Sequence, residues 1–161
     1  MAVKHDGLID MEKKLKELEN DIPEIMDRLV VEEGEYVRDQ AVLICQRKNI
    51  HRTGHYMRGF NFGKRAIRAG KYYKIDVFNN VEYAKHLEYG FRGHWVPGRW
   101  EGKSFVYMKG YRGGGMYVKF TPGHLVLTTA VENTKKSQDA RLERKYREEL
   151  KRRGFGKYAD L

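Results

Sequence analysis

The histidines, acidic residues and single cysteine of this chain are the side chains best suited to chemistry, so their spacing is considered first. His51 and His55 are four residues apart and could share one helix face, as two ligands of a zinc site do. Thr53-Gly54 lies between them and opposes a helix there, and no Glu or Cys lies nearby to complete the ligand set. The sequence therefore predicts no metal site.

A second pair, His86 and Glu88, lies in the segment 81–89 and could act as an acid and a base. The alternative is that Tyr83 and Leu87 pack inward, while His86 and Glu88 face solvent or a neighbouring subunit. We favour this alternative, which makes the segment structural.

The nucleophiles of the chain are few. Cys45 falls on the apolar stripe of a predicted helix, which indicates a core position. Ser104 and Ser137 do not lie in a nucleophile elbow, and Gly113 to Gly115 are not followed by the Lys-Ser or Lys-Thr of a phosphate-binding loop. There is no dinucleotide-binding fingerprint either. We therefore expect no catalytic residue, no cofactor and no enzymatic activity, with a degenerate nuclease as a competing hypothesis.

Composition indicates a soluble globular protein that contacts other macromolecules. The chain of 161 residues is 40% hydrophobic and 34% charged, and its net charge is +10. This length predicts one domain, 1–161. No apolar run is long enough to cross a membrane, the N-terminus does not resemble a signal peptide, and the lone cysteine fits a reducing cytosol. The positive charge favours contact with nucleic acid or an acidic protein.

The elements that must position these residues begin with two predicted helices. Apolar residues at three- and four-residue spacing predict a helix over Leu8 to Glu19. Asn20-Asp21 is expected to interrupt it. Asp21 would then cap a second helix, with Pro23 in its first turn, that reaches Arg47.

A hairpin and a short helix are expected next. The strands are predicted over Tyr56 to Lys64 and Tyr72 to Phe78, with the turn at Arg68 to Lys71. The short helix spans Val81 to Tyr89 and stops at Gly90.

The last third of the chain is predicted as a loop, a hairpin and a long helix. Phe91 to Gly102 is expected to be irregular, and Phe105 to Lys109 to pair with Met116 to Phe120. Thr121 would cap the final helix, with Pro122 at its first position, and this helix continues to about Arg153. The order of elements predicts the α+β class, with N-terminal helices, a small antiparallel sheet carrying a short helix, and a long C-terminal helix.

Aromatic and basic residues interleave between Tyr56 and Tyr73, as they do in single-stranded nucleic-acid binders. The same residues are also consistent with an ordinary half-buried hairpin. We favour the hairpin because the aromatic residues alternate as strand packing requires.

In this order, several short segments resemble the tail-completion, or head–tail joining, family of siphophages, also described as minor capsid or neck proteins. The segments are Thr53-Gly54, Asn79 to Ala84, Glu88 to Gly90, Trp95 to Arg99, and Leu125 to Ala130. The most specific of these segments runs from Tyr83-Ala84 to Glu88-Tyr89-Gly90. The motif residues are Thr53, Gly54, Asn80, Tyr83, Ala84, Glu88, Tyr89 and Gly90.

This resemblance implies a structural virion protein that forms a homo-oligomeric ring, a hexamer or alternatively a dodecamer. The ring would lie at the head-proximal end of the tail, contact adjacent neck or tail-tube proteins, and join the tail to the DNA-filled capsid. Genomic DNA would pass through it, and assembly would take place in the cytoplasm of the bacterial host. The alternative function is a basic nucleic-acid-binding protein without enzymatic activity.

One departure from the resembling family is the interval 101–121, which we interpret as an inserted hairpin. Aromatic and arginine side chains in and beside it are the usual anchors of protein interfaces. The predicted interface residues are Trp95, Arg99, Trp100, Phe105, Tyr107, Tyr111, Arg112 and Tyr117. The competing hypothesis is that these residues only cover the core.

Overall fold

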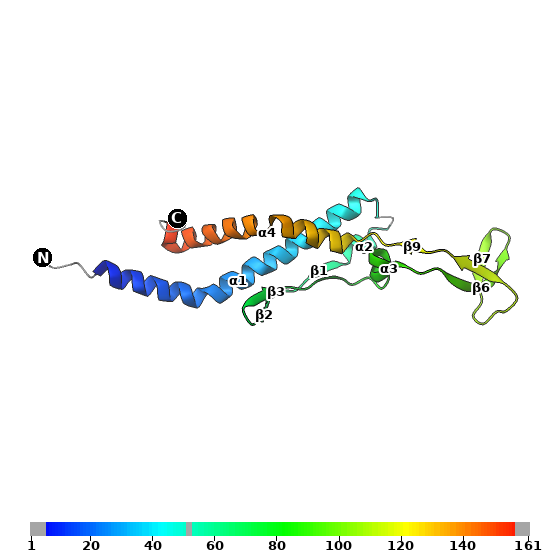
Figure 1. Ribbon diagram of the computed structural model, residues 1–161, viewed down its shortest axis with the longest axis horizontal. Helices are drawn as coiled ribbons and strands as arrows, with labels where there is room; N and C mark the ends of the chain where they lie inside the picture. The colour runs from blue at the N-terminus through cyan, green and yellow to red at the C-terminus, as the bar shows by residue number, and fades with distance from the viewer. Residues whose placement is uncertain (1–5, 51–52, 157–161) are drawn as a thin grey trace.

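The protein is elongated, with two long helices at one end and a β-rich projection at the other (Figure 1). The structure is a computed structural model that describes residues 6–50 and 53–156. Helix α1 (Asp6–Arg47) runs from the N-terminus toward the projection, and α4 (Val126–Leu150) returns beside it. A π-helical segment, η1 (Lys151–Phe155), continues α4. The observed class is α+β, as predicted.

The N-terminal helix is continuous, so the predicted break at Asn20-Asp21 was wrong. Pro23 lies inside α1, where its ring removes one backbone hydrogen bond and bends a helix without having to end it. Figure 1 shows α1 bent in its N-terminal part. Apolar residues at helical spacing lie on both sides of Pro23, so a single continuous helix is favoured across this position.

The core lies where α1, α2 (His55–Arg58), β1 (Phe60–Phe62) and α4 meet. Side chains at helical spacing on α1 pack against aromatic rings of the next two elements and the first turns of α4. The buried residues of this cluster are Val37, Ala41, Ile44, Cys45, Tyr56, Phe60, Val126 and Ala130. Cys45 is therefore a core residue, as expected.

Between the core and α3, the chain forms two short antiparallel pairs. β2 (Ile67–Ala69) pairs with β3 (Tyr72–Lys74) across a turn at Gly70, and β1 pairs with β4 (Val77–Asn79). The predicted hairpin is thus present, with its strands interrupted. Its start at Tyr56 was wrong: Tyr56 lies on α2, because Gly54 adopts the left-handed conformation, with φ of 67°, and begins that helical turn.

Oppositely charged side chains line the antiparallel contact between α1 and α4. Arg141 on α4 binds Glu33 on α1 through two hydrogen bonds of 2.5 and 3.0 Å, and both side chains are mostly buried. Lys145 pairs with Glu32 at 2.6 Å. The guanidinium carbon of Arg141 also lies 4.0 Å from the centre of the Tyr36 ring. These pairs fix the register of the two helices.

Neither α1 nor α4, nor any shorter helix within the described ranges, is both long and apolar enough to cross a membrane.

Candidate functional site

The β-rich projection comprises residues 90–123, which we call the arm. It leaves the body through β5 (Gly90–Phe91) and returns through β9 (Thr121–Pro122), and these two strands pair with each other. A Cβ atom on Gly90 would lie 2.2 Å from the carbonyl oxygen of Thr121, so only glycine allows this close approach. The arm is therefore attached by a narrow two-stranded neck.

Beyond the neck, the arm is a three-stranded antiparallel sheet in the order β7-β6-β8. Its central strand, β6 (His94–Glu101), was predicted as an irregular loop, and its partners β7 (Ser104–Tyr107) and β8 (Gly115–Val118) were predicted to pair with each other. Both predictions were wrong. β7 pairs with the second half of β6 and β8 with the first half.

Pro97 explains why β6 was hard to recognise. Proline inside a run normally argues against a central strand, because it cannot donate a ladder hydrogen bond. Here Pro97 lies just past the last β7 pair, Gly98 with Tyr107, while its carbonyl oxygen accepts a hydrogen bond of 3.0 Å from the N–H of Met108. The missing N–H therefore falls where one ladder ends, and the strand continues.

Large aromatic side chains lie on both faces of this sheet. The register places Trp95 and Tyr117 opposite each other on one face, and Trp100 opposite Phe105 on the other, with their ring centroids 5.3 Å apart. Trp95, Trp100 and Tyr117 are each more than half exposed. No helix of the described residues covers either face (Figure 1). The arm thus exposes the kind of side chains that proteins normally bury.

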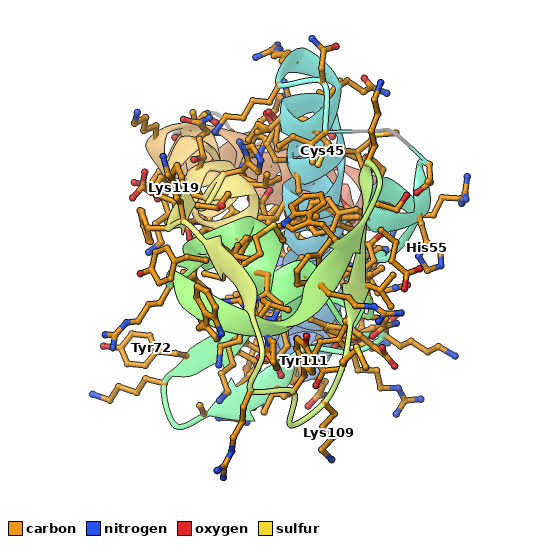
Figure 2. All side chains as sticks on the ribbon, turned by 90° about the vertical axis from the view of Figure 1, so that its right-hand side faces the viewer. Cys45, His55, Tyr72, Lys109, Tyr111 and Lys119 are labelled. Carbon is orange, nitrogen blue, oxygen red and sulfur yellow. The ribbon has the colours of Figure 1, made fainter. Side chains whose placement is uncertain are left out.

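All eight residues predicted to form an interface lie in the arm. Trp95, Arg99 and Trp100 are on β6, Phe105 and Tyr107 on β7, Tyr117 on β8, and Tyr111 and Arg112 in the loop between β7 and β8. Figure 2 looks along the molecule at this end and shows Lys109, from the same loop as Tyr111, extending away from the sheet. Both tryptophans lie on the arm, outside the core cluster.

The motif residues lie around the base of the arm. Asn79, at the end of β4, donates a hydrogen bond of 2.9 Å to the carbonyl oxygen of Tyr56 and accepts one of 3.0 Å from the N–H of Val81. The N–H of Asn80 donates to the carbonyl oxygen of Gly59 at 3.0 Å. Thr53 Oγ1 accepts a hydrogen bond from the N–H of His55, just before α2. This segment therefore holds α3 (Ala84–Tyr89) beside the core.

Glu88 has a role that the sequence did not reveal. The prediction that it faces solvent was wrong, because it is only 7% exposed. Its carboxylate accepts hydrogen bonds from the N–H of Leu127 at 3.0 Å and from the N–H and hydroxyl of Thr128, both at 2.8 Å. These N–H groups are unpaired in the first turn of α4, where a negative charge also meets the positive end of the helix dipole.

This cap replaces the predicted one. Thr121 and Pro122 belong to β9, and α4 begins only at Val126, after Leu125 in a left-handed conformation. Local signals for a helix start assume that the capping side chain lies next to the helix in sequence. Here the cap comes from α3 on the other side of the arm, so Glu88 ties the two ends of the arm to one point.

The tyrosines of the motif point outward. Tyr83 is 41% exposed and Tyr89 is 65% exposed, whereas Leu87 and Ala84 pack against the core cluster. The expectation that Tyr83 packs inward was therefore wrong, whereas the same expectation for Leu87 is confirmed. Gly90 ends α3 with φ of 77°, as predicted, and starts the arm.

In the described part of the chain, the residues considered for chemistry make other contacts. Within residues 6–50 and 53–156, no group of three or more His, Cys, Asp or Glu side chains could hold a metal ion. His51 lies outside the described residues, and the His55 ring lies 6.5 Å from the Tyr83 ring. Glu88 binds the start of α4, and the His86 ring stacks edge-on against Phe91.

Two buried groups of the core have raised pKa values. Burial, together with the negative charge of Glu88, raises the pKa of the Cys45 thiol from 9.0 to about 11. The same two causes raise the pKa of the Tyr56 hydroxyl well above its ordinary value of 10.0. Both groups are therefore neutral at physiological pH.

A second exposed surface is the β2–β3 hairpin, residues 64–74, whose charged side chains are all basic. They are Lys64, Arg65, Arg68, Lys71 and Lys74. Each of these residues is exposed, and so is Tyr72 near the turn, at 77%. Figure 2 shows the Tyr72 ring projecting from this hairpin into solvent.

Comparison with known proteins relates the body to phage proteins. The model of the HK97-gp10-like family, described as "Bacteriophage HK97-gp10, putative tail-component", matches residues 9–90, about half of the 161-residue chain. The match runs from α1 to α3 and ends at Gly90, where the arm begins. Neither a curated protein nor a solved structure gives a significant match.

The matched range contains the most specific resembling segment, Tyr83 to Gly90, whereas Trp95–Arg99 and Leu125–Ala130 lie outside it. A tail component is a structural part of the virion. The chain belongs to the HK97-gp10-like family of bacteriophage tail components.

Proposed function

We propose that this protein forms a homo-oligomeric ring at the head-proximal end of the tail, and that the ring joins the tail to the DNA-filled capsid. The observation that carries the proposal is the arm, which exposes aromatic side chains on both faces of a sheet that projects from the body. The role is structural rather than catalytic.

The physical argument is that a small isolated sheet is stabilised poorly when no layer covers it. Burying a large aromatic side chain at an interface contributes much of the binding energy in known complexes. Trp95 with Tyr117 and Trp100 with Phe105 provide one such cluster on each face of the arm. An arm inserted between two partner surfaces would cover both clusters at once.

A projecting arm also suits ring assembly. When the arm of one subunit binds the body of the next, the two surfaces in contact differ, and such head-to-tail contacts form a closed ring if the rotation between subunits is right. The other face of the arm would then remain for an adjacent neck or tail-tube protein. Copy number follows from that rotation, and six is the number that the family resemblance implies.

We also propose that the chain is one domain whose arm is an insertion. The family match ends at Gly90, and Glu88 caps α4 directly after the arm returns. The inserted segment proposed from the sequence, 101–121, covers β7, β8 and the loop between them.

Deleting the arm tests the proposal. Phe91 and Thr121 are paired across the neck, so residues 92–120 can be replaced by Asn-Gly, a dipeptide that favours a tight hairpin turn. We expect a folded body by circular dichroism, and phage lysates with separate heads and tails by electron microscopy. Normal virions from this variant would refute the docking role of the arm.

A point variant controls for indirect effects of the deletion. Trp100→Ser removes one exposed ring from the arm, and Tyr72→Ser removes one exposed ring from the β2–β3 hairpin. Reduced head–tail joining is expected for Trp100→Ser only. Equal loss with both variants would indicate a general effect of surface aromatic residues rather than a docking role of the arm.

The β2–β3 hairpin favours a second candidate function, binding of double-stranded DNA. Five exposed cations, uninterrupted by acidic residues, lie on a two-stranded ribbon and directly before it, and the major groove admits such a ribbon. Five phosphate contacts predict that log K falls with log salt concentration with a slope of about −4 to −5.

Binding to random-sequence duplex DNA over a range of salt concentrations tests this candidate. Replacing Lys64, Arg68 and Lys71 by Ser should reduce the steepness of the slope by about 3. The matched control replaces Lys103, Lys109 and Arg112 of the arm by Ser and should leave the slope unchanged. Equal effects would mean that the net charge, and not the hairpin, determines binding.

A further inference from the structure

The N-terminal part of α1 carries a heptad pattern. Met11, Leu15, Leu18, Ile22, Ile25 and Leu29 follow one another at alternating steps of four and three residues. This spacing is the a/d pattern of a coiled coil, with Leu15 and Ile22 at a positions and Leu18 and Ile25 at d positions. We call the part from Met11 to Ile22 the free seam.

The pattern divides into a buried and an exposed part. Ile25 is 1% exposed and Leu29 is 4% exposed, whereas Met11, Leu15 and Ile22 are 39%, 47% and 39% exposed. The division falls where the returning helix ends, because Arg153 of η1 pairs with Asp21 of α1. Figure 1 shows α1 continuing beyond this point without a neighbour.

The free seam is poorly stabilised in a single subunit. An isolated helix of about 12–15 residues is only marginally stable in water, because the free energy gained from its hydrogen bonds barely exceeds the free-energy cost of nucleation. An apolar stripe along it is normally buried against another element. The part of the chain that the structure describes offers no such element to the free seam.

The spacing specifies the partner. In a coiled coil, side chains at the a and d positions of one helix pack best against those of a helix with the same 3.5-residue spacing. The free seam of a second copy has this spacing. We propose that the free seam forms a parallel coiled coil with the free seam of a second copy of this chain. The contact continues the seam that α1 already uses inside each subunit.

The charged residues beside the seam favour the parallel orientation. Lys14 occupies a g position, and Glu12 and Glu19 occupy e positions. In a parallel pair, Lys14 of one copy faces Glu19 of the other, because g contacts the e position five residues later. In an antiparallel pair, e positions face each other and the glutamates repel.

Disulfide cross-linking tests the orientation in the full chain. Leu18→Cys should give covalent dimers under mild oxidation, since d positions of a parallel in-register pair lie side by side. Asn20→Cys, on the opposite side of the same helix, is the matched control. The native Cys45 does not interfere, because it is fully buried. No excess of dimer from Leu18→Cys over the control would overturn the proposal.

Analytical ultracentrifugation tests the association itself. Wild type should show concentration-dependent association above its 19.0 kDa mass. Leu15→Glu buries a charge in the seam and should weaken association about a hundredfold, while Asn20→Glu, with the same change of charge, should have no effect. Equal association of the two variants would refute the seam.

A reciprocal charge exchange separates this proposal from the function proposed for the arm. Lys14→Glu should weaken association, and adding Glu19→Lys should restore it. The arm-deletion variant should still associate through the seam. Association that depends on the arm and not on Leu15 would overturn the seam and leave the proposed ring standing.

Discussion

Glu88 connects the element before the arm to the element after it. Its carboxylate lies at the start of α4 and accepts the N–H groups of Leu127 and Thr128, while the backbone carbonyl of Glu88 accepts a hydrogen bond of 3.0 Å from the N–H of Leu125. The Glu88 side chain thereby contacts Thr128, which lies 40 residues later in the sequence. This side chain therefore joins the segment before the arm to the segment after it.

Glu88→Ala should destabilise the protein by about 2–4 kcal/mol, because two partly buried N–H groups lose their acceptor and the helix loses its cap. Urea denaturation measures this loss. Glu82→Ala, an exposed glutamate just before α3, should change stability by less than about 0.5 kcal/mol. A comparably small effect at Glu88 would contradict the capping role.

The buried thiol of Cys45 predicts a pH dependence of stability. Its pKa is raised from 9.0 to about 11 in the folded protein, so between these values the unfolded chain loses a proton that the folded chain retains. Stability is therefore complete below pH 9 and falls as pH rises toward 11. Tyr56, whose pKa is also raised, adds to the fall at the alkaline end.

Cys45→Ala should make this fall shallower, although it also creates a small cavity that lowers stability at every pH. Urea midpoints of both proteins at several pH values between 9 and 11 give the comparison. Parallel curves for the two proteins would show that other groups cause the dependence.

Residue burial was only partly predictable from the sequence. Cys45 and Leu87 were assigned correctly because helical periodicity reports which side of a helix faces the core. The same rule failed for Glu88 and Tyr83, because α3 is too short for its own periodicity to decide. The capping contact of Glu88 joins segments that only the tertiary fold brings together.

At the scale of elements, the contact between α1 and α4 is the largest in the body and combines an apolar seam with buried charge. The side chains of Arg141 and Glu33 are 13% and 7% exposed, so each charge needs the other to offset its loss of contact with water. Such a pair determines the register of the two helices more than it adds stability. The free energy lost when two ions leave water is about as large as the free energy gained from their attraction.

Arg141→Ala should cost about 3–5 kcal/mol, since it leaves the Glu33 carboxylate buried without a partner. The double variant Glu33→Met with Arg141→Met should recover most of that loss. Arg147→Ala, which removes an exposed pair with Glu143, is the control and should cost at most about 0.5 kcal/mol. Thermal denaturation of all three variants decides, and a double variant no more stable than Arg141→Ala would disprove the coupling.

Element type was predicted well where patterns are long and poorly where single residues carry strong local signals. Pro23 does not end α1, whose apolar residues continue at helical spacing, and Pro97 does not end β6, which pairs with two strands. In both places, tertiary packing overrides local propensity. The strand partners in the arm were missed for another reason. A turn at Gly102 and a long loop with three glycines both permit hairpins, and the sequence alone did not decide between them.

At the scale of the whole molecule, the two surfaces that need partners lie at opposite ends. The arm projects from one end and the free seam of α1 from the other, with the core between them (Figure 1). An elongated subunit with a binding surface at each end can contact neighbours at two levels of an assembly. The family match covers the free seam and the body up to Gly90, and it includes neither the arm nor α4.

The arm should become ordered on assembly. In the free chain, its sheet is covered by no other layer and opens at low cost, so backbone N–H groups of residues 101–121 should exchange with deuterium quickly. In virions, partner surfaces on both faces should slow this exchange strongly, while residues of the core cluster such as Ala41 and Ala130 are protected in both states. Hydrogen exchange with mass spectrometry on free protein and purified virions makes the comparison. Equal protection of residues 101–121 in the two states would mean that the aromatic faces stay uncovered in the virion, and the arm would then not be the docking element.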